Sequence, residues 1–408
     1  MYRLLSDQPE RIADQFNFDA MAKILKTVVI ETPPPFTIGI FGEWGSGKTT
    51  LMHRLDAQLL EGGQKTVWFN AWRYDGKEVV WNALIQSIFL AMQSDEDVKD
   101  ADFKARLIET GRNLARFAAR KAIAPLTGGL VTAEHLDKAA ALLSPLTADD
   151  PQFKFINEFE AGFRSLVSEY VGENGRLVVF VDDLDRCLPE TAVEVLEAIK
   201  LYLDNANVTF VIGVEPEVVR QGIRHRYQNN EVLAEKEYLE KIVQLPFMMR
   251  GLDDEMAMRL LRPYAKTAPY VDDPVMTGMI FAATEKNPRR IKRFINTFYV
   301  LTEMQRVAGR TLEREDTIRL ALALLTQLHF REIFQIMERS HGIVQRWNEN
   351  DTKPSRRERE NAIAESPDLQ AVDDVLRAKD LFAQVRDIDC SDTAMKPWIT
   401  LTRGDDPR

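Results

Sequence analysis

Residues 38–55, IGIFGEWGSGKTTLMHRL, contain the stretch that decides the fold. An apolar run rich in β-branched and aromatic residues ends at Phe41, glycines then cluster around a lysine, and apolar residues follow at helical spacing. Strand, glycine-rich loop and helix in this order are typical of parallel α/β sheets that bind phosphate groups. The stretch therefore predicts an α/β fold.

The loop after Phe41 matches the pattern G-x-x-x-x-G-K-[ST], in which backbone N–H groups and a helix N-terminus face phosphate oxygens. The predicted phosphate contacts are Gly42, Glu43, Trp44, Gly45, Ser46, Gly47, Lys48, Thr49 and Thr50. We expect Lys48 to reach the β- and γ-phosphates, and the Thr49 hydroxyl to bind Mg²⁺. A glycine-rich turn with an incidental lysine is the alternative interpretation.

A second strand with carboxylates at its end is predicted by LVVFVDD, residues 177–183. A phosphate loop of this type needs such a carboxylate for Mg²⁺, so we assign Asp182 to the metal and Asp183 to polarising the attacking water. A helix cap or turn is the alternative role for Asp183. Arg186 is a candidate for stabilising transition-state charge, although an exposed Asp185–Arg186 ion pair fits the sequence equally well.

The rest of the sequence predicts a parallel sheet with helices on both faces. Strands are expected at residues 36–41, 66–72, within 176–185, at 207–214 and at 242–247. One amphipathic helix is expected over residues 9–28, before the prolines of TPPPF.

Four regions follow from these patterns. The predicted regions are a first part of the P-loop NTPase core (1–93), a helical insertion (94–150), a second part of the core (151–250) and a C-terminal helical domain (251–408). The insertion is Ala-rich and shows no strand signal, and it lies between the two nucleotide motifs.

Composition excludes several classes of protein. The 408 residues carry a net charge of −10, which argues against a nucleic-acid or membrane binder over its whole surface. The two cysteines, Cys187 and Cys390, have no metal-ligand spacing, and the five histidines form no recognisable metal or catalytic pattern. No secretory signal or apolar run long enough to span a membrane is present, so the cytoplasm is the expected location.

Five segments together resemble the KAP family of P-loop NTPases, over roughly residues 10–300. They are GEWGSGKTTLM, WFNAWRY, VVFVDDLDRC, YLEKIVQLPF and NPRRIKRFIN. The resemblance implies a P-loop core followed by a helical region in which Asn287, Pro288, Arg289 and Arg290 sense the nucleotide. A solvated basic helix face is the alternative for RRIKRF. No N-K-x-D guanine-reading motif follows the magnesium motif, which favours ATP over GTP as the ligand.

One departure from the family concerns the insertion. Many bacterial relatives have transmembrane helices between the two nucleotide motifs, whereas this chain has only the polar stretch 94–150. Residues 103–121 include a basic set that could lie on phospholipid or nucleic acid. The set is Lys104, Arg106, Arg112, Arg116, Arg120 and Lys121, against Glu109. An exposed face on an acidic protein is the favoured alternative.

The resemblance and the motifs together predict an ATPase that acts as a nucleotide-dependent switch in an assembly, either with copies of itself or with companion proteins. The family's link to phage exclusion implies bacterial defence. A non-hydrolysing scaffold and a P-loop kinase are the alternatives. At the rim of the loop, we expect Trp44 to close over the γ-phosphate side and Glu43 to pair with Arg289 or Arg290; ordinary packing is the alternative for both.

Overall fold

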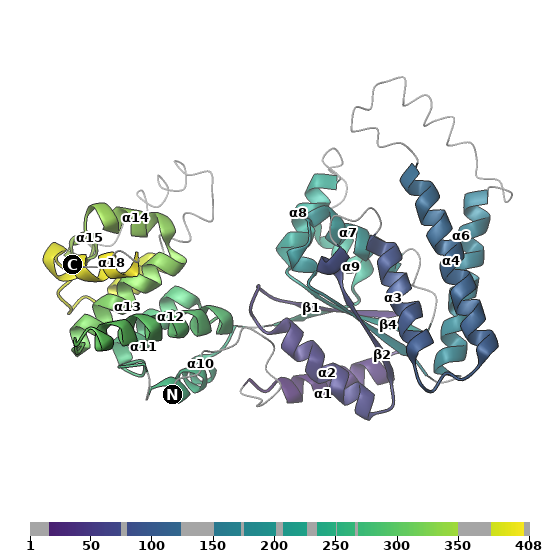
Figure 1. The fold of residues 1–408 in the computed structure, drawn as a ribbon, viewed down its shortest axis with the longest axis horizontal. Coiled ribbons are helices and arrows are strands. Elements are labelled where there is room, and N and C mark those ends of the chain that lie inside the picture. The colour runs from purple at the N-terminus through teal and green to yellow at the C-terminus, as the bar shows by residue number, and fades with distance from the viewer. Residues whose placement is uncertain are drawn as a thin grey trace, which may run out of the picture. The chain divides into compact units, whose positions relative to one another are not determined.

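The computed structural model describes residues 16–74, 80–123, 151–172, 175–200, 207–226, 235–249, 251–265, 268–349 and 377–403. The chain divides into two compact units (Figure 1). The first unit is Asn17–Met249, and the second is Arg250–Arg408 together with Met1–Phe16. Each unit has its own hydrophobic core.

A five-stranded parallel sheet forms the centre of the first unit. Its strands are β1 (Phe36–Phe41), β2 (Lys65–Asn70), β3 (Leu177–Asp182), β4 (Val208–Val214) and β5 (Leu245–Met248), in the order β2-β3-β4-β1-β5. β3 and β4 are buried along their whole length, as their continuous apolar runs predict. The predicted α/β fold is confirmed.

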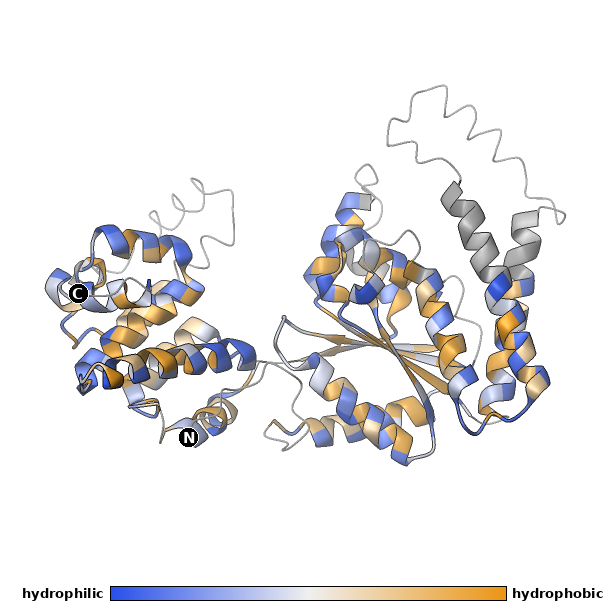
Figure 2. Cartoon of the chain, viewed as in Figure 1, coloured by the Kyte–Doolittle hydropathy of each residue, from blue (hydrophilic) through white to orange (hydrophobic). Residues whose placement is uncertain are grey.

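Helices cover both faces of this sheet (Figure 1). One face carries α1 (Phe18–Glu31) and α2 (Lys48–Glu61), and the other carries α3 (Val80–Ser94), α7 (Pro189–Ala198) and α8 (Pro216–Arg226). Figure 2 shows hydrophobic strands between helices that have one hydrophobic and one hydrophilic side. The apolar sides face the sheet because burial of apolar surface is the main favourable term in folding.

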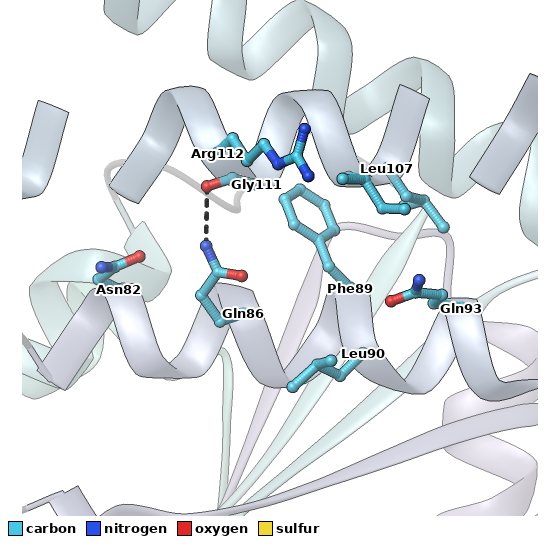
Figure 3. Close-up of a pocket in the computed structure, with 9 residues that line it drawn as sticks. Asn82, Gln86, Phe89, Leu90, Gln93, Leu107, Gly111 and Arg112 are labelled. Atoms are coloured by element: carbon cyan, nitrogen blue, oxygen red, sulfur yellow. Dashed lines mark hydrogen bonds between the residues drawn. The ribbon is translucent and has the colours of Figure 1, made fainter. Parts of the chain in front are cut away.

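Two long helices pack against each other: α4 (Ala101–Ile123), within the predicted insertion, and α6 (Pro151–Val171), at the start of the predicted second part of the core. A cavity of about 320 Å³ lies between α3 and α4 (Figure 3). The Gln86 side chain donates a hydrogen bond across it to the Gly111 carbonyl at 2.9 Å, beside the ring of Phe89. These contacts attach α4 to the core. No helix among the described segments is long and apolar enough to cross a membrane.

The start of α1 differs from the predicted helix over residues 9–28. The helix begins at Phe18, because Asn17 has a left-handed backbone with φ 60°. Asparagine tolerates this conformation, which a helix cannot continue through. The prediction is therefore wrong at residues 16–17, and residues 9–15 lie outside the described part of the chain.

The last strand is also displaced from its predicted place at 242–247. Helix α9 (Glu235–Ile242) extends to Ile242, and the Val243 N–H still bonds to the Leu239 carbonyl. The apolar pair Ile242 and Val243 packs into the core from the end of this helix, so its apolar character did not signal a strand. β5 follows at the edge of the sheet, where Pro246 is tolerated.

The second unit is helical throughout its described residues. Its helices include α10 (Asp254–Leu261), α11 (Pro274–Thr284), α12 (Pro288–Val307), α13 (Arg314–His329), α14 (Arg331–Arg339), α15 (Ile343–Glu349) and α18 (Asp392–Thr402). α13 is buried from Thr317 to Thr326 and contacts α11, α12, α14 and α18. This helix is therefore the centre of the second core.

Candidate functional site

The loop between β1 and α2 has the backbone that its glycines predict. Gly45 and Gly47 have left-handed φ angles of 87° and 102°, which residues with a Cβ rarely adopt. A Cβ at Gly42 would lie 2.8 Å from Ser46 Oγ, and one at Gly47 would meet the ring of Phe18, the first residue of α1, at 2.8 Å. The glycines therefore allow the tight winding of the loop, and α1 packs against it.

Lys48, the first residue of α2, directs its ammonium group into this loop. Its Nζ donates hydrogen bonds to the carbonyls of Gly42 at 3.0 Å and Glu43 at 3.2 Å. The same Nζ forms an ion pair with Asp185 Oδ2 at 2.7 Å, and both side chains are almost fully buried, with exposures of 6% and 5%. A buried ammonium at the N-terminus of a helix is suited to bind phosphate oxygens.

Thr49 and Asp182, the two predicted magnesium ligands, are brought together at the carboxyl edge of the sheet. The Thr49 side chain is hydrogen-bonded to the Asp182 carboxylate. Burial is the main cause that raises the pKa of Asp182 to about 6, and the nearby carboxylates of Asp183 and Asp185 add to it. Gly213 of β4 leaves room here, because a Cβ would lie 3.1 Å from Asp182 Oδ1.

Asp183 has a left-handed backbone, with φ 59°, and its carboxylate points to the end of β2. Asn70 Nδ2 donates to Asp183 Oδ2 at 2.6 Å, and Arg186 Nε lies 2.7 Å from Asp183 Oδ1. Asp183 precedes the short 3₁₀ turn η2 (Leu184–Arg186), but its side chain makes no capping bond to that turn. A side-chain cap is therefore not observed, whereas the turn alternative is: the Asp183 carbonyl accepts a hydrogen bond from Arg186 N within the turn at 3.2 Å.

The alternative of an exposed Asp185–Arg186 pair is also not observed. Asp185 is buried and pairs with Lys48, while Arg186 pairs with Asp183. The guanidinium of Arg186 lies 5.3 Å from the ring centroid of Trp72, in a cation–π contact. In the turn after β3, Asp185 thus contacts Lys48 of the phosphate loop, and the next residue, Arg186, contacts the ring of Trp72.

Two carboxylates of the site were missed by the sequence prediction. The sequence places Asp185 only in an alternative exposed pair with Arg186, and it assigns no role to Glu215. Glu215 follows β4 directly and accepts a hydrogen bond from the backbone N–H of Trp44, and burial raises its pKa. The apolar run VTFVIGVE ends in a carboxylate just as LVVFVDD does, which was the available signal.

The residues present fit a nucleotide with Mg²⁺. In the described ranges, no group of three or more His, Cys, Asp or Glu side chains could hold a metal by itself. Magnesium is usually bound through one or two carboxylates together with phosphate oxygens, which matches Thr49 and Asp182 beside the loop. Ser46 Oγ is buried in the loop and has no hydrogen-bond partner among the described residues, so it can bind a further ligand oxygen.

The predicted sensing arginines lie in the second unit. Asn287 caps α12, and its side chain accepts hydrogen bonds from the backbone N–H groups of Arg289 and Arg290. Arg290 pairs with Glu285, and Lys292 is buried, so RRIKRF is not a fully solvated face. Since the nucleotide loop belongs to the other unit, the approach of Arg289 or Arg290 to it stays a prediction.

The basic stretch 103–121 forms most of α4. Arg106 is paired with Glu169 of α6 at 2.6 Å, and Arg112 lines the cavity against α3 (Figure 3). The side chains of residues 113–123 lie outside the description. Contact of this helix with nucleic acid or a membrane surface stays a prediction.

An all-parallel sheet with a phosphate loop after β1 and a carboxylate after β3 defines a P-loop nucleotide-binding domain. The chain belongs to the KAP family: the family model described as KAP family P-loop domain matches residues 18–305. The resemblance inferred from the motifs is thereby confirmed.

One curated relative is the phage T7 exclusion protein of Escherichia coli (strain K12), which is 21% identical over 333 residues. The match covers 73% of this chain but only 42% of the relative, so the chain spans about two fifths of that protein's length.

Among the solved structures that resemble this chain are three proteins, compared by identity, the share of each chain covered and the TM-score. They are the Aeropyrum pernix ORC1 protein in complex with DNA (13% identity, 97% of this chain and 94% of that chain, TM-score 0.40), Cdc6p from Pyrobaculum aerophilum (10%, 98% and 97%, 0.42) and Drosophila ORC bound to DNA (12%, 98% and 80%, 0.37).

The raised pKa of Asp182 predicts how stability depends on pH. Because this carboxyl titrates at about 6 when folded and at about 4 when unfolded, its contribution is complete below about pH 4 and is lost as pH rises through about 6. In EDTA, the free energy of unfolding of the first unit should fall by roughly 2–3 kcal/mol over this window. Asp182→Asn should remove that fall, as measured by chemical denaturation across a pH series.

Added Mg²⁺ should stabilise the wild type more at about pH 7.5 than at about pH 5, because protons compete for Asp182. Asp95→Asn is the matched control. The bonds from Lys65 and Tyr170 lower the pKa of Asp95 to about 2 against the effect of burial, which places it outside the window. If the free energy of unfolding of Asp182→Asn fell with pH as it does in the wild type, Asp182 would not be the group that titrates at about pH 6.

Proposed function

We propose that the chain binds ATP with Mg²⁺, hydrolyses it, and uses the nucleotide state to change an assembly with copies of itself or with companion proteins. The observation that carries the proposal is the convergence of Lys48, Thr49 and Asp182 at one edge of a parallel sheet. In this arrangement a phosphate group meets a buried cation, backbone N–H groups and a metal-binding carboxylate together.

Each residue has a separate part in the proposal. Lys48 binds the β- and γ-phosphates, the loop from Gly42 to Thr50 surrounds them, and Thr49 and Asp182 hold Mg²⁺. The bound metal neutralises charge on the phosphate oxygens. Asp183, directly after the metal ligand, polarises the attacking water, and Arg186 stabilises transition-state charge.

A non-hydrolysing scaffold is the second candidate, and one observation favours it. Both oxygens of Asp183 already have partners, Asn70 and Arg186, which leaves this carboxylate less available to a water molecule. Hydrolysis then requires that Arg186 release Asp183 and turn toward the phosphates. This requirement fits an ATPase that is slow until a partner acts on it.

The biological setting is proposed from the curated relative. Its name, phage T7 exclusion protein, supports a part in defence against phage. We place this chain in such a defence as the nucleotide-dependent component.

The proposal is tested by measuring turnover and molecular mass on the same purified chain, with ADP, ATP and a non-hydrolysable ATP analogue. We expect release of inorganic phosphate from ATP, and a different mass in light scattering with the analogue than with ADP. Binding without turnover would favour the scaffold, and phosphate transferred to an added acceptor would favour a kinase. A chain that binds none of the three nucleotides would overturn the proposal.

The rim of the loop gives a further prediction. Trp44 is 46% exposed beside the loop, and its backbone N–H donates a hydrogen bond to Glu215. Trp44→Ala should lower turnover, or weaken assembly, by about 5- to 30-fold, the effect of losing one aromatic contact at an interface. Leu60→Ala, an exposed apolar residue at the other end of α2, is the control. The idea fails if Trp44→Ala alters neither measurement.

Pairing of Glu43 with Arg290 is tested by a double-mutant cycle. Glu43→Ala and Arg290→Ala should lower turnover by amounts that do not add, because each removes the same contact. Additive effects would assign Arg290 only to its observed pair with Glu285.

A further inference from the structure

The ammonium group of Lys48 contacts three acceptors, of which two accept hydrogen bonds; the third meets it as an ion pair, through an Asp185 Oδ2 that has no hydrogen-bond partner among the described residues. Two of these are the carbonyls of Gly42 and Glu43, which belong to the loop itself, and the third is the carboxylate of Asp185. A phosphate oxygen that binds Lys48 must therefore share the ammonium with these acceptors or replace one of them.

Asp185 is the acceptor most opposed to a phosphate. Its carboxylate is buried to 95% against Lys48, and phosphate oxygens on the same ammonium would place like charges close together away from water. The loop carbonyls are neutral and their positions are fixed by the glycine backbone. The repulsion between Asp185 and the ligand is therefore greatest for the nucleotide whose phosphates bring the most negative charge to Lys48.

We infer that Asp185 is a specificity-determining residue that competes with the terminal phosphate of the nucleotide for Lys48, and that its displacement moves the turn η2. The inference rests on the proposed function only in that the ligand is a nucleoside triphosphate held at Gly42–Thr50. Asp185 reduces affinity for the triphosphate more than for the diphosphate, so binding of the triphosphate changes the turn and binding of the diphosphate changes it less.

The contacts of the turn η2 connect Asp185 to the surface of the protein. Among these contacts are two backbone hydrogen bonds, from Arg186 N to the Asp183 carbonyl at 3.2 Å and from Cys187 N to the Leu184 carbonyl at 3.3 Å. Arg186, next to Asp185, stacks on Trp72, which is 53% exposed. A movement of Asp185 therefore changes both hydrogen bonds and the contact between Arg186 and Trp72. The exposed surface of Trp72 that a partner can contact then depends on which nucleotide is bound.

The first test compares the affinities of wild type and Asp185→Asn for ADP and for a non-hydrolysable ATP analogue by calorimetry. We expect Asp185→Asn to bind the analogue about 10-fold more tightly, with a smaller gain for ADP. The matched control is Asp95→Asn, which removes a carboxylate paired with Lys65 at 2.8 Å at the opposite end of the strands and should change neither affinity. Equal or weaker binding of the analogue by a folded Asp185→Asn would overturn the inference.

The second test uses only the wild type and so does not depend on how the variant folds. Hydrogen exchange at the Arg186 and Cys187 amides should be faster with the ATP analogue than with ADP. The same rate with both saturating nucleotides would overturn the inference and leave ATP binding intact. If neither wild type nor Asp185→Asn binds any nucleotide, the proposed function fails and this inference fails with it. Binding by Asp185→Asn alone would support the inference.

Discussion

Lys48→Ala is expected to weaken binding of ATP and ADP by at least about 100-fold, because it removes a buried side-chain cation that lies inside the loop. Calorimetric titration measures the change. Lys65→Ala is the control, since Lys65 is also a paired lysine of the first unit but lies at the start of β2. An unchanged dissociation constant in Lys48→Ala would count against the phosphate loop as the binding site.

The same substitution affects stability for a separate reason. Without Lys48, the buried carboxylate of Asp185 has lost its ion-pair partner, and leaving such a charge uncompensated costs on the order of 3 kcal/mol. Asp185→Asn in the Lys48→Ala background should restore most of this stability without restoring nucleotide binding. Comparison of Lys48→Ala with this double variant thus separates the loss of stability from the loss of nucleotide affinity.

The variant Asp183→Asn is expected to bind ATP normally and to hydrolyse it about 100- to 10,000-fold more slowly, the usual contribution of a positioned acid or base. The amide keeps the size of the side chain but cannot accept a proton from water at neutral pH. Asn70→Ala is the matched variant: it removes the hydrogen bond to Asp183 and keeps the carboxylate, so turnover should fall much less. Phosphate release and analogue binding are measured on all three proteins.

If Asp183→Asn still hydrolysed ATP at the wild-type rate, another carboxylate would have to polarise the attacking water. Glu215 is the residue to test, because it follows the strand between β1 and β3 and is held against the loop by the Trp44 N–H. Loss of turnover in Glu215→Gln with retention in Asp183→Asn would assign the role to Glu215.

Local patterns predicted the elements that carry the motifs. The strand predicted at 36–41 is β1 without change, because a continuous apolar run ends there at a glycine. The loop backbone is permitted by Gly45 and Gly47, because glycine adopts left-handed φ angles without a steric penalty. The strand predicted at 242–247 begins too early because Ile242 and Val243 are buried apolar residues, which fit either a strand or the end of a helix.

The sequence by itself thus determined the phosphate loop, the carboxylate after β3 and the helical character of the second unit, since each depends on residues close together in the chain. Only the tertiary structure decided which side chains meet. Its strand order places β4 between β1 and β3, which brings Glu215 to the loop, and the turn after β3 buries Asp185 on Lys48. Parallel pairing joins segments far apart in sequence, so it is set by packing of the whole core, which no local pattern specifies.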